Sequence, residues 1–262
     1  MYLCIYFLYY INILYNYYTI YVMIHLITYG DTKYEESKKR LCKQADNLGW
    51  FDIILSYGPE DIDADFQEQF KHILELPSGG GCSIWKPYII NKRLNEMQDD
   101  DILLYLDAGC YINPNGYDRF TEYIDLLNNR NEGCISFSMS NHIEKKWTCK
   151  EIFEYFNIYE DSDIVNTGQI LSGIIMLKKN TNSIHIIDLW LRTLYNNSKL
   201  FTDNFNENQR AEYIENKHDQ SIFSVISKLY NTILLEDETI FDDGFGCDKS
   251  TKYPFWETRI IL

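Results

Sequence analysis

The strongest constraint on the fold is an alternation, along residues 23–262, of short apolar runs with longer stretches whose apolar residues recur at helical spacing. The short runs are apolar throughout, which is typical of strands buried on both faces of a parallel sheet. The alternation predicts an α/β domain with a mainly parallel central sheet and helices on both faces. Strands are predicted at Ile24–Thr28, Phe51–Ser56, Asp101–Leu106, Cys134–Met139, Ile170–Leu177 and Thr232–Leu235. Helices are predicted at Lys33–Leu48, Phe66–Leu76, Pro87–Met97, Tyr117–Asn128, Ser183–Tyr195 and Gln220–Tyr230, and flexible or polar loops at Pro77–Gly81 and Asp203–Asn216.

The beginning of the chain differs from the rest. The stretch Tyr2–Val22 contains no Lys, Arg, Asp or Glu and is long enough to cross a bilayer, which takes about 20 apolar residues. Its many tyrosines oppose that interpretation, because tyrosine prefers the membrane interface. No positively charged segment precedes it and no small-residue cleavage site follows it, which argues against a signal peptide. Residues 1–22 are therefore a hydrophobic, tyrosine-rich extension, a packed element or a membrane anchor, and residues 23–262 form one domain.

Charge and cysteine content exclude several classes of protein. The net charge of −15 would repel a phosphate backbone, so we expect no nucleic-acid partner. Seven cysteines form no C-x-x-C pair, and their odd number argues against both a disulfide framework and a zinc ribbon. Reduced thiols in a reducing compartment are the simplest account, so a cytoplasmic location is expected, with membrane association if residues 1–22 act as an anchor.

One carboxylate stands out at the end of a predicted strand. The apolar run Ile102–Leu106 is followed by Asp107, and then by the small residues Ala108 and Gly109. Ligands of open α/β sheets bind outside the carboxyl ends of the strands, and small residues let a ligand approach the backbone. Asp107 is therefore a candidate to hold a ribose hydroxyl or a divalent cation on a diphosphate. The alternative is that it caps the next turn.

A glycine-rich segment precedes this strand. Gly79–Gly81 leads into a predicted helix, and free N–H groups at such a place can bind an anion. The segment matches neither a P-loop nor the dinucleotide-binding glycine pattern. Lys86 is a candidate to neutralise a phosphate and Trp85 to pack on a sugar or base. A flexible loop followed by a buried tryptophan is the alternative.

Two further polar clusters flank apolar elements. His218, Asp219 and Gln220 come directly before an apolar helix, where Asp219 either caps the helix or reaches into a cleft. Histidine is a common ligand for transition metals, whereas Mg²⁺ and Mn²⁺ prefer oxygen. The small and polar residues of Asn166–Gly173 flank a predicted strand and suit contacts with sugar hydroxyls, or else mark a glycine bulge.

Taken in order, these four clusters resemble the GT-A glycosyltransferases, whose fold is Rossmann-like. The resemblance covers roughly residues 24–235. It rests on the helix that begins at Trp85-Lys86-Pro87-Tyr88, the strand end Leu106-Asp107-Ala108-Gly109, the small-residue strand at Ser172-Gly173-Ile174, and the helix start Asp219-Gln220-Ser221. The combination is similar to glycosyltransferases of large DNA viruses and of bacterial surface-polysaccharide clusters. One residue departs from the family's motif, which has two carboxylates, because position 109 is glycine.

The resemblance implies transfer of a sugar from a nucleoside-diphosphate sugar to a hydroxyl of a glycan or glycoconjugate, in the host cytoplasm if the protein is viral. It implies Asp107 and Asp219 as catalytic residues, with Asp163 as the second candidate for the base. The donor-binding residues that it implies are Tyr29, Trp85, Lys86, Asp107, Ala108 and Gly109, and the acceptor-binding residues are Gln169, Ser172, Gly173 and Gln220. The implied cofactor is Mn²⁺ or Mg²⁺, held by Asp107 and His218. Alternatives are a sugar-nucleotide-binding relative that has lost catalysis with the second carboxylate, and a glycosidase that uses Asp107 and Asp219 as its carboxylate pair.

Overall fold

The structure is a computed structural model that describes residues 22–203 and 208–261, so the interpretation of residues 1–22 lies outside it except for Val22. Its strands are β1 (Ile24–Tyr29), β2 (Ile53–Tyr57), β3 (Ile102–Leu106), β4 (Tyr111–Ile112), β5 (Cys134–Ile143), β6 (Gly168–Ile170), β7 (Ile174–Lys178), β8 (Ile233–Glu236) and β9 (Phe255–Trp256). Its helices are α2 (Glu35–Leu48), α3 (Ala64–Leu74), α4 (Gly79–Cys82), α5 (Trp85–Glu96), α6 (Tyr117–Asn129), α7 (Glu144–Trp147), α8 (Lys150–Tyr155), α9 (Asp163–Asn166), α10 (Thr181–Asn196) and α11 (Asp219–Leu229).

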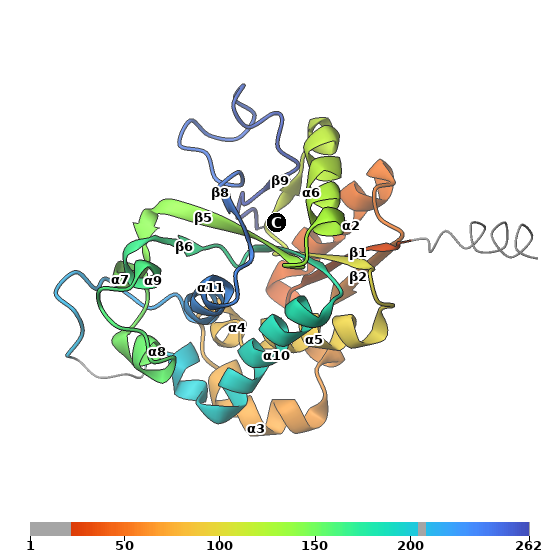
Figure 1. Cartoon of the computed structure of the whole chain (residues 1–262). Coiled ribbons are helices and arrows are strands. Elements are labelled where there is room, and N and C mark those ends of the chain that lie inside the picture. The colour runs from red at the N-terminus through yellow and green to blue at the C-terminus, as the bar shows by residue number, and fades with distance from the viewer. Residues whose placement is uncertain (1–21, 204–207, 262) are drawn as a thin grey trace, which may run out of the picture.

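In the described part of the chain, a seven-stranded sheet forms the centre of the molecule (Figure 1). Its order is β2-β1-β3-β7-β5-β6, and β8 pairs with β5 as well. The strands β1, β2 and β3 are parallel, β7 is antiparallel to both β3 and β5, and β8 is parallel to β5. Five strands of this sheet therefore run in one direction, and only β6 and β7 oppose them. The fold class is α/β with a mainly parallel sheet, as the sequence predicts.

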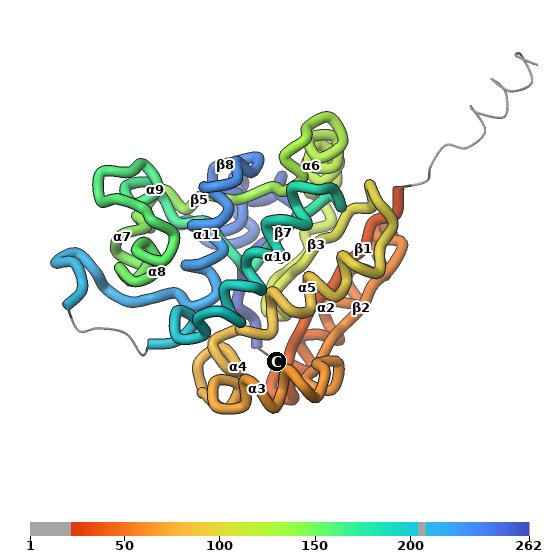
Figure 2. Tube along the Cα trace, turned by 60° about the horizontal axis from the view of Figure 1, so that its bottom comes forward, coloured from red at the N-terminus to blue at the C-terminus, as the bar shows by residue number. Residues whose placement is uncertain are grey.

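Helices cover both faces of the sheet because side chains of a strand point alternately to opposite faces. Leu103 and Tyr105 of β3 join one apolar cluster with residues of α3, α5, α10 and α11. Leu104 and Leu106 join a second cluster with residues of α2 and α6. Figure 2 shows α5, α10 and α11 on the first face, where α10 contacts both of the other helices. Both faces of β3 are thus buried, which explains its unbroken apolar sequence.

One strand prediction is wrong. The predicted strand Ile170–Leu177 is two strands, β6 and β7, which are separated at Leu171–Gly173 and occupy different places in the sheet. The strand β6 lies on the outer edge against β5, whereas β7 lies between β3 and β5. Ser172 and Gly173 lie at this break, but the same residues also fit a glycine bulge within one strand, so the local pattern does not distinguish the two. The short connection places Ser172 and Gly173 beside the end of β3.

The predicted loop at Pro77–Gly81 contains part of a tight turn. Gly79, Gly80 and Gly81 have φ values of 55°, 58° and 91°, and Cys82 and Ser83 continue the left-handed conformation. Glycine adopts this conformation at little cost, whereas other residues enter it only at about 1–2 kcal/mol each. The glycines thus let the chain reverse between α3 and α5.

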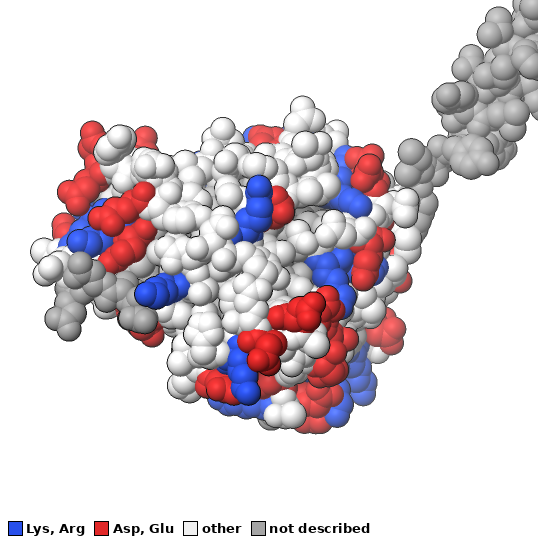
Figure 3. Space-filling model, turned by 90° about the horizontal axis from the view of Figure 1, so that it is seen from below, with Lys and Arg blue, Asp and Glu red and all other residues white. Residues whose placement is uncertain are grey.

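The charged surface is mixed rather than basic. On the face drawn in Figure 3, Asp and Glu side chains gather in groups with Lys and Arg beside them, and uncharged surface lies between. This agrees with the net charge of −15. Among the helices of residues 22–203 and 208–261, none combines the length and apolar character needed to traverse a bilayer.

Candidate functional site

The site lies where β1 and β3 end and β7 begins. Leu106 pairs with Ile174 in the antiparallel register of β3 and β7. The backbone N–H of Asp107 then donates to the carbonyl of Gly173 at 2.8 Å. The strand pairing therefore brings two of the predicted clusters together, although they are far apart in sequence.

Lys86 is the centre of a buried charged group. It lies in the first turn of α5, is 3% exposed, and its Nζ lies 3.2 Å from both Asp107 Oδ1 and Asp219 Oδ2. It also donates to the carbonyl of Ser172 at 3.2 Å. Burial lowers the pKa of Lys86, but the charges of Asp107 and Asp219 outweigh burial and raise it. Lys86 thus stays charged and ties α5, β3 and α11 together.

The two carboxylates have different environments. Asp219 is 6% exposed and accepts from Ser172 Oγ at 2.9 Å, and burial raises its pKa against the effect of Lys86. The side chain of Asp107 is 39% exposed, and its Oδ1 accepts from the hydroxyl of Tyr105. Asp107 can therefore contact a ligand directly, whereas Asp219 is largely occupied by protein partners.

Asp107 and Lys86 line a cavity of about 920 Å³. Its walls come from the end of β1, the glycine turn, the start of α5, the end of β3, the start of α11 and the C-terminal segment. Of the predicted donor- and acceptor-binding residues, those on its wall are Tyr29, Trp85, Lys86, Asp107, Ala108, Gly109, Ser172, Gly173 and Gln220. The fold therefore brings nine of these ten positions to one cavity.

Tyr29 and Trp85 form one wall as a pair. Their rings are stacked, with centroids 3.8 Å apart and an interplanar angle of 19°. The indole N–H of Trp85 donates to the carbonyl of Gly79 at 3.2 Å, which anchors the ring to the glycine turn. One face of each ring is thus covered by the other, so a base or sugar that stacks here can use only the remaining faces.

The structure explains why position 109 is glycine. A Cβ atom on Gly109 would lie 2.9 Å from the Cα of Arg259, which belongs to the backbone of the C-terminal segment. The carbonyl of Gly109 accepts from Ile260 N at 3.0 Å and from Thr258 Oγ1 at 2.6 Å. The C-terminal segment thus fills the space that a second carboxylate of the motif would need.

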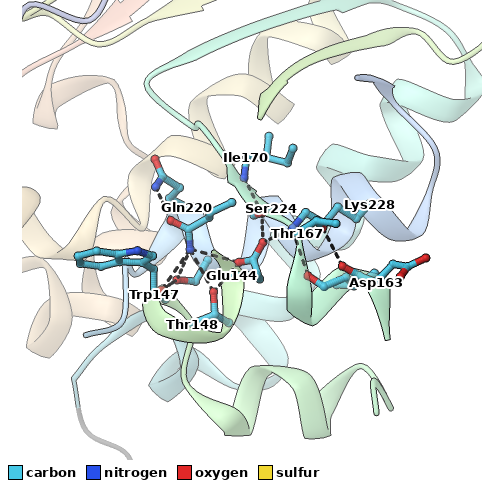
Figure 4. A network of polar contacts seen from close by, with 12 residues as sticks. Glu144, Trp147, Thr148, Asp163, Thr167, Ile170, Gln220, Ser224 and Lys228 are labelled. Carbon is cyan, nitrogen blue, oxygen red and sulfur yellow. Dashed lines mark hydrogen bonds and ion pairs between the residues drawn. The ribbon is translucent and has the colours of Figure 1, made fainter. Parts of the chain in front are cut away.

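The predicted acceptor residue Gln169 does not reach the cavity wall. It is 0% exposed, and its Nε2 donates to Glu144 Oε1 at 3.2 Å and to Thr148 Oγ1 at 3.1 Å. Its Oε1 accepts from Gln220 Nε2 at 2.7 Å. Figure 4 shows this polar network, in which Glu144 lies between Gln220 and Lys228, both residues of α11. Gln169 thus supports Gln220, and Gln220 in turn accepts from the N–H of Ser172 at 3.2 Å.

The residues do not fit the divalent cation that the resemblance implies. His218 has its Nε2 3.0 Å from Asp203 Oδ1, and it is not among the described residues that line the cavity. Oδ1 of Asp107 is paired with the ammonium group of Lys86 at 3.2 Å. In the part of the chain that the structure describes, no three His, Cys, Asp or Glu side chains are grouped so as to hold a metal.

Asp163, the second candidate for the base, begins α9 and is also absent from the described cavity wall.

Glu257 is a site residue that the sequence does not reveal. It directly follows β9, lines the cavity, and its side chain is 9% exposed. Burial raises the pKa of Glu257 to about 7, and the negative charge of Asp107 adds to this effect. The rule that polar residues follow strands applies here too, but a strand of two residues, Phe255–Trp256, is too short to be recognised from its pattern.

The raised pKa predicts a pH-dependent stability. Folded protein keeps the Glu257 proton up to about pH 7, whereas the unfolded chain loses it near pH 4.5. Between these values the folded state binds more protons, so the free energy of unfolding falls as the pH rises. Glu257→Gln cannot ionise at this position and serves as the reference. Between pH 5 and pH 8, the free energy of unfolding of wild type should fall by about 2 kcal/mol more than that of Glu257→Gln. Urea unfolding of wild type and of Glu257→Gln at pH 5 and pH 8 measures this difference. If the free energies of unfolding of both proteins changed equally with pH, the prediction would be contradicted.

Comparison with known proteins gives similarities of structure only. Neither a protein-family model nor a curated protein matches the sequence. The chain is similar to a glycosyltransferase involved in the glycosylation of the major capsid of PBCV-1, at 14% identity over 89% of this chain and 93% of that one, with a TM-score of 0.49. It is similar to the galactosyltransferase LgtC in complex with donor and acceptor sugar analogs, at 11% identity over 82% and 74%, with a TM-score of 0.42. It is also similar to mouse xyloside xylosyltransferase 1, at 11% identity over 92% and 100%, with a TM-score of 0.45. These three likenesses concern the fold alone.

Proposed function

We propose that this protein is a glycosyltransferase that moves a sugar from a nucleoside-diphosphate sugar to a hydroxyl of a glycan or glycoconjugate. The observation that carries the proposal is the cavity of about 920 Å³ at the ends of β1 and β3, with the carboxylate of Asp107 partly exposed on its wall. Cavities of about 300–1,000 Å³ at the carboxyl ends of α/β strands suit ligands of this size.

The cavity offers groups for each part of such a donor. Asp107 is the acceptor for a ribose or sugar hydroxyl, since part of its carboxylate remains exposed beside Lys86. The Tyr29–Trp85 pair lines the cavity and is the candidate to contact the base. Ser172, Gly173 and Gln220 lie on the wall beside Asp107 and are candidates for the acceptor side.

Transfer also requires positive charge for the departing diphosphate. Among the described residues, the Lys and Arg side chains that line the cavity are Lys86, Lys217 and Arg259. Lys86 is enclosed by its carboxylate partners, and Lys217 is paired with Glu215. Arg259 is the most accessible of the three, with a side chain that is 79% exposed and lies next to Gly109. A guanidinium can bind phosphate oxygens through two N–H groups, so Arg259 is the leading candidate for the diphosphate.

The test of the function is binding and turnover of a panel of UDP- and GDP-hexoses. A nucleotide at about 100 times its Kd should raise the free energy of unfolding by about 2.7 kcal/mol, which thermal shift detects. We expect Asp107→Asn to lose this shift and to release nucleoside diphosphate at least ~100-fold more slowly than wild type. Lys86 would keep Asp219 and Ser172 as partners, so this variant should fold.

The matched control is Asp99→Asn, a removal of an exposed carboxylate in the loop that precedes β3. It should bind and react as wild type does. Binding without any turnover in wild type would favour the alternative of a sugar-nucleotide-binding relative that lacks catalysis. Cleavage of glycosides without nucleotide binding would favour the glycosidase, and either result would overturn the proposal.

A further inference from the structure

Glu257 lines the cavity and carries a buried carboxylate oxygen without a protein partner. Its Oε2 has no hydrogen-bond partner among the residues that the structure describes, and its Oε1 is 3.6 Å from Arg259 Nε. An unpaired polar atom in a buried position is costly, and most such atoms in native proteins are satisfied. Because this side chain also lines the cavity, its missing partner is best explained as a group of a bound substrate.

The absence of a side chain at Gly173 makes room for this carboxylate. A Cβ atom on Gly173 would lie 2.1 Å from Glu257 Oε2, so the carboxylate occupies the space where any larger residue would place its side chain. Gly173 accepts the backbone hydrogen bond of Asp107, which puts Glu257 at the same strand end as Asp107. The backbone N–H of Glu257 donates to Thr239 O at 3.0 Å and holds the segment that carries it.

The other carboxylates of the cavity are less suited to accept a proton. Asp219 is paired with Lys86 and accepts from Ser172, and Asp107 accepts from Tyr105 and pairs with Lys86. Asp31 accepts from the N–H of Lys33 as a helix cap. Among the carboxylates of the described cavity wall, Glu257 is therefore the one with a buried oxygen that lacks a hydrogen-bond partner.

We propose that Glu257, rather than Asp219, accepts the proton of the attacking hydroxyl. This rests on the proposed function. The oxygen of the acceptor hydroxyl forms a bond to the anomeric carbon of the donor sugar, and its proton passes to the carboxylate of Glu257. The bond between the anomeric carbon and the phosphate oxygen breaks, and its electron pair leaves with the nucleoside diphosphate. A single displacement of this kind inverts the anomeric configuration.

The electrostatic surroundings are consistent with this role. The charged groups that act on Glu257 are Asp107 and Asp237, which raise its pKa, and Lys86 and Arg259, which lower it. A general base works best when its pKa is near the working pH. Binding of a diphosphate to Arg259 would also weaken the contact between Arg259 and Glu257 and leave the carboxylate free for the acceptor.

The test compares Glu257→Gln with wild type in release of nucleoside diphosphate from the reactive members of the UDP- and GDP-hexose panel. Positioned bases contribute about 10²–10⁴-fold, so we expect kcat to fall at least ~100-fold and the acid limb of the pH profile near pH 7 to disappear. Thermal shift with UDP or GDP should stay as in wild type. Glu236→Gln, which removes an exposed carboxylate at the end of β8, is the matched control and should keep both kcat and the pH profile.

A second variant separates catalysis from a structural role. Azide is a nucleophile that needs no base, so Glu257→Ala should form a glycosyl azide from the donor at a rate restored toward that of wild type, while its reaction with hydroxyls stays slow. A kcat of Glu257→Gln within threefold of wild type, an unchanged acid limb or no rescue by azide would overturn the assignment of Glu257 alone. Wild type that binds no nucleotide and consumes no donor would overturn the proposed function, and the assignment with it.

Discussion

Replacement of Glu144 by leucine is expected to lower the free energy of unfolding by about 3–5 kcal/mol. This is the usual cost of removing one of the two partners of a buried ion pair. Glu144 is 0% exposed, and Lys228 Nζ lies 2.7 Å from its Oε2. The side chain of Lys228 is only 8% exposed, so the substitution leaves an ammonium group in the interior without its carboxylate. Its remaining contact, to the carbonyl of Ile164 at 3.2 Å, cannot balance the charge.

Other groups would lose a partner at the same time. Glu144 also accepts hydrogen bonds from Thr148 Oγ1 at 2.6 Å, from Gln169 Nε2 and from the hydroxyl of Ser224 (Figure 4). Each unsatisfied buried group adds to the cost. Since Gln169 holds Gln220 at the cavity wall, where Gln220 is a candidate for the acceptor side, we expect this variant to bind the acceptor more weakly as well as to unfold more easily.

Urea unfolding monitored by circular dichroism measures the change. The matched control is Glu36→Leu, which breaks the exposed pair between Glu36 and Lys39 on α2 and should change stability by less than about 1 kcal/mol. The double variant Glu144→Leu with Lys228→Met should recover much of the loss, since it removes the unpaired charge. Equal stabilities of Glu144→Leu and Glu36→Leu would show that the network contributes little.

The sequence predicts those parts of the site that depend only on the order of elements. Asp107 follows a long apolar strand, so the rule for strand ends is enough to place it at the edge of the sheet. Lys86 is predicted in a similar way, from its position at the start of a helix. Lys86 also forms ion pairs with both Asp107 and Asp219. These contacts join segments that are far apart in the sequence, so no local pattern predicts them.

The misplaced predictions have a common physical cause. The pattern of Ile170–Leu177 predicts one strand with Gln169 at the cavity, whereas Gln169 belongs to the separate strand β6 and donates to Glu144. The partner Glu144 begins α7, a helix of four residues that is too short to have a recognisable period. Glu257 likewise reaches the site through packing of the C-terminal segment on Gly109, which lies far earlier in the chain.

That packing leads to the second large effect, on substitution of Gly109. Restoring the second carboxylate of the motif by Gly109→Asp should destabilise the protein by about 1–3 kcal/mol, because overpacking forces the backbone to shift. The new Cβ would lie 2.9 Å from the Cα and 3.2 Å from the carbonyl carbon of Arg259, neither of which can rotate away. The hydrogen bonds of Thr258 and Ile260 to the Gly109 carbonyl would be strained as well.

Comparison with Gly109→Ala separates shape from charge. Alanine has the same Cβ without the carboxylate, so most of the loss in the free energy of unfolding should appear in both variants. In a chain shortened after Thr258 the obstructing backbone is gone, and Gly109→Ala should then cost little, which a double-mutant cycle by urea unfolding would show. An undiminished cost in the shortened chain would place the obstruction elsewhere.

The same displacement should affect the site. Glu257 and Arg259 both belong to the segment that packs on Gly109, so a shift of this segment moves the proposed proton acceptor and the proposed diphosphate ligand together. We therefore expect Gly109→Asp to lose nucleotide binding in thermal shift rather than to gain a response to Mn²⁺. A variant that binds the donor more tightly when Mn²⁺ is added would instead mean that the segment can yield and that the cavity accepts a metal once a second carboxylate is present.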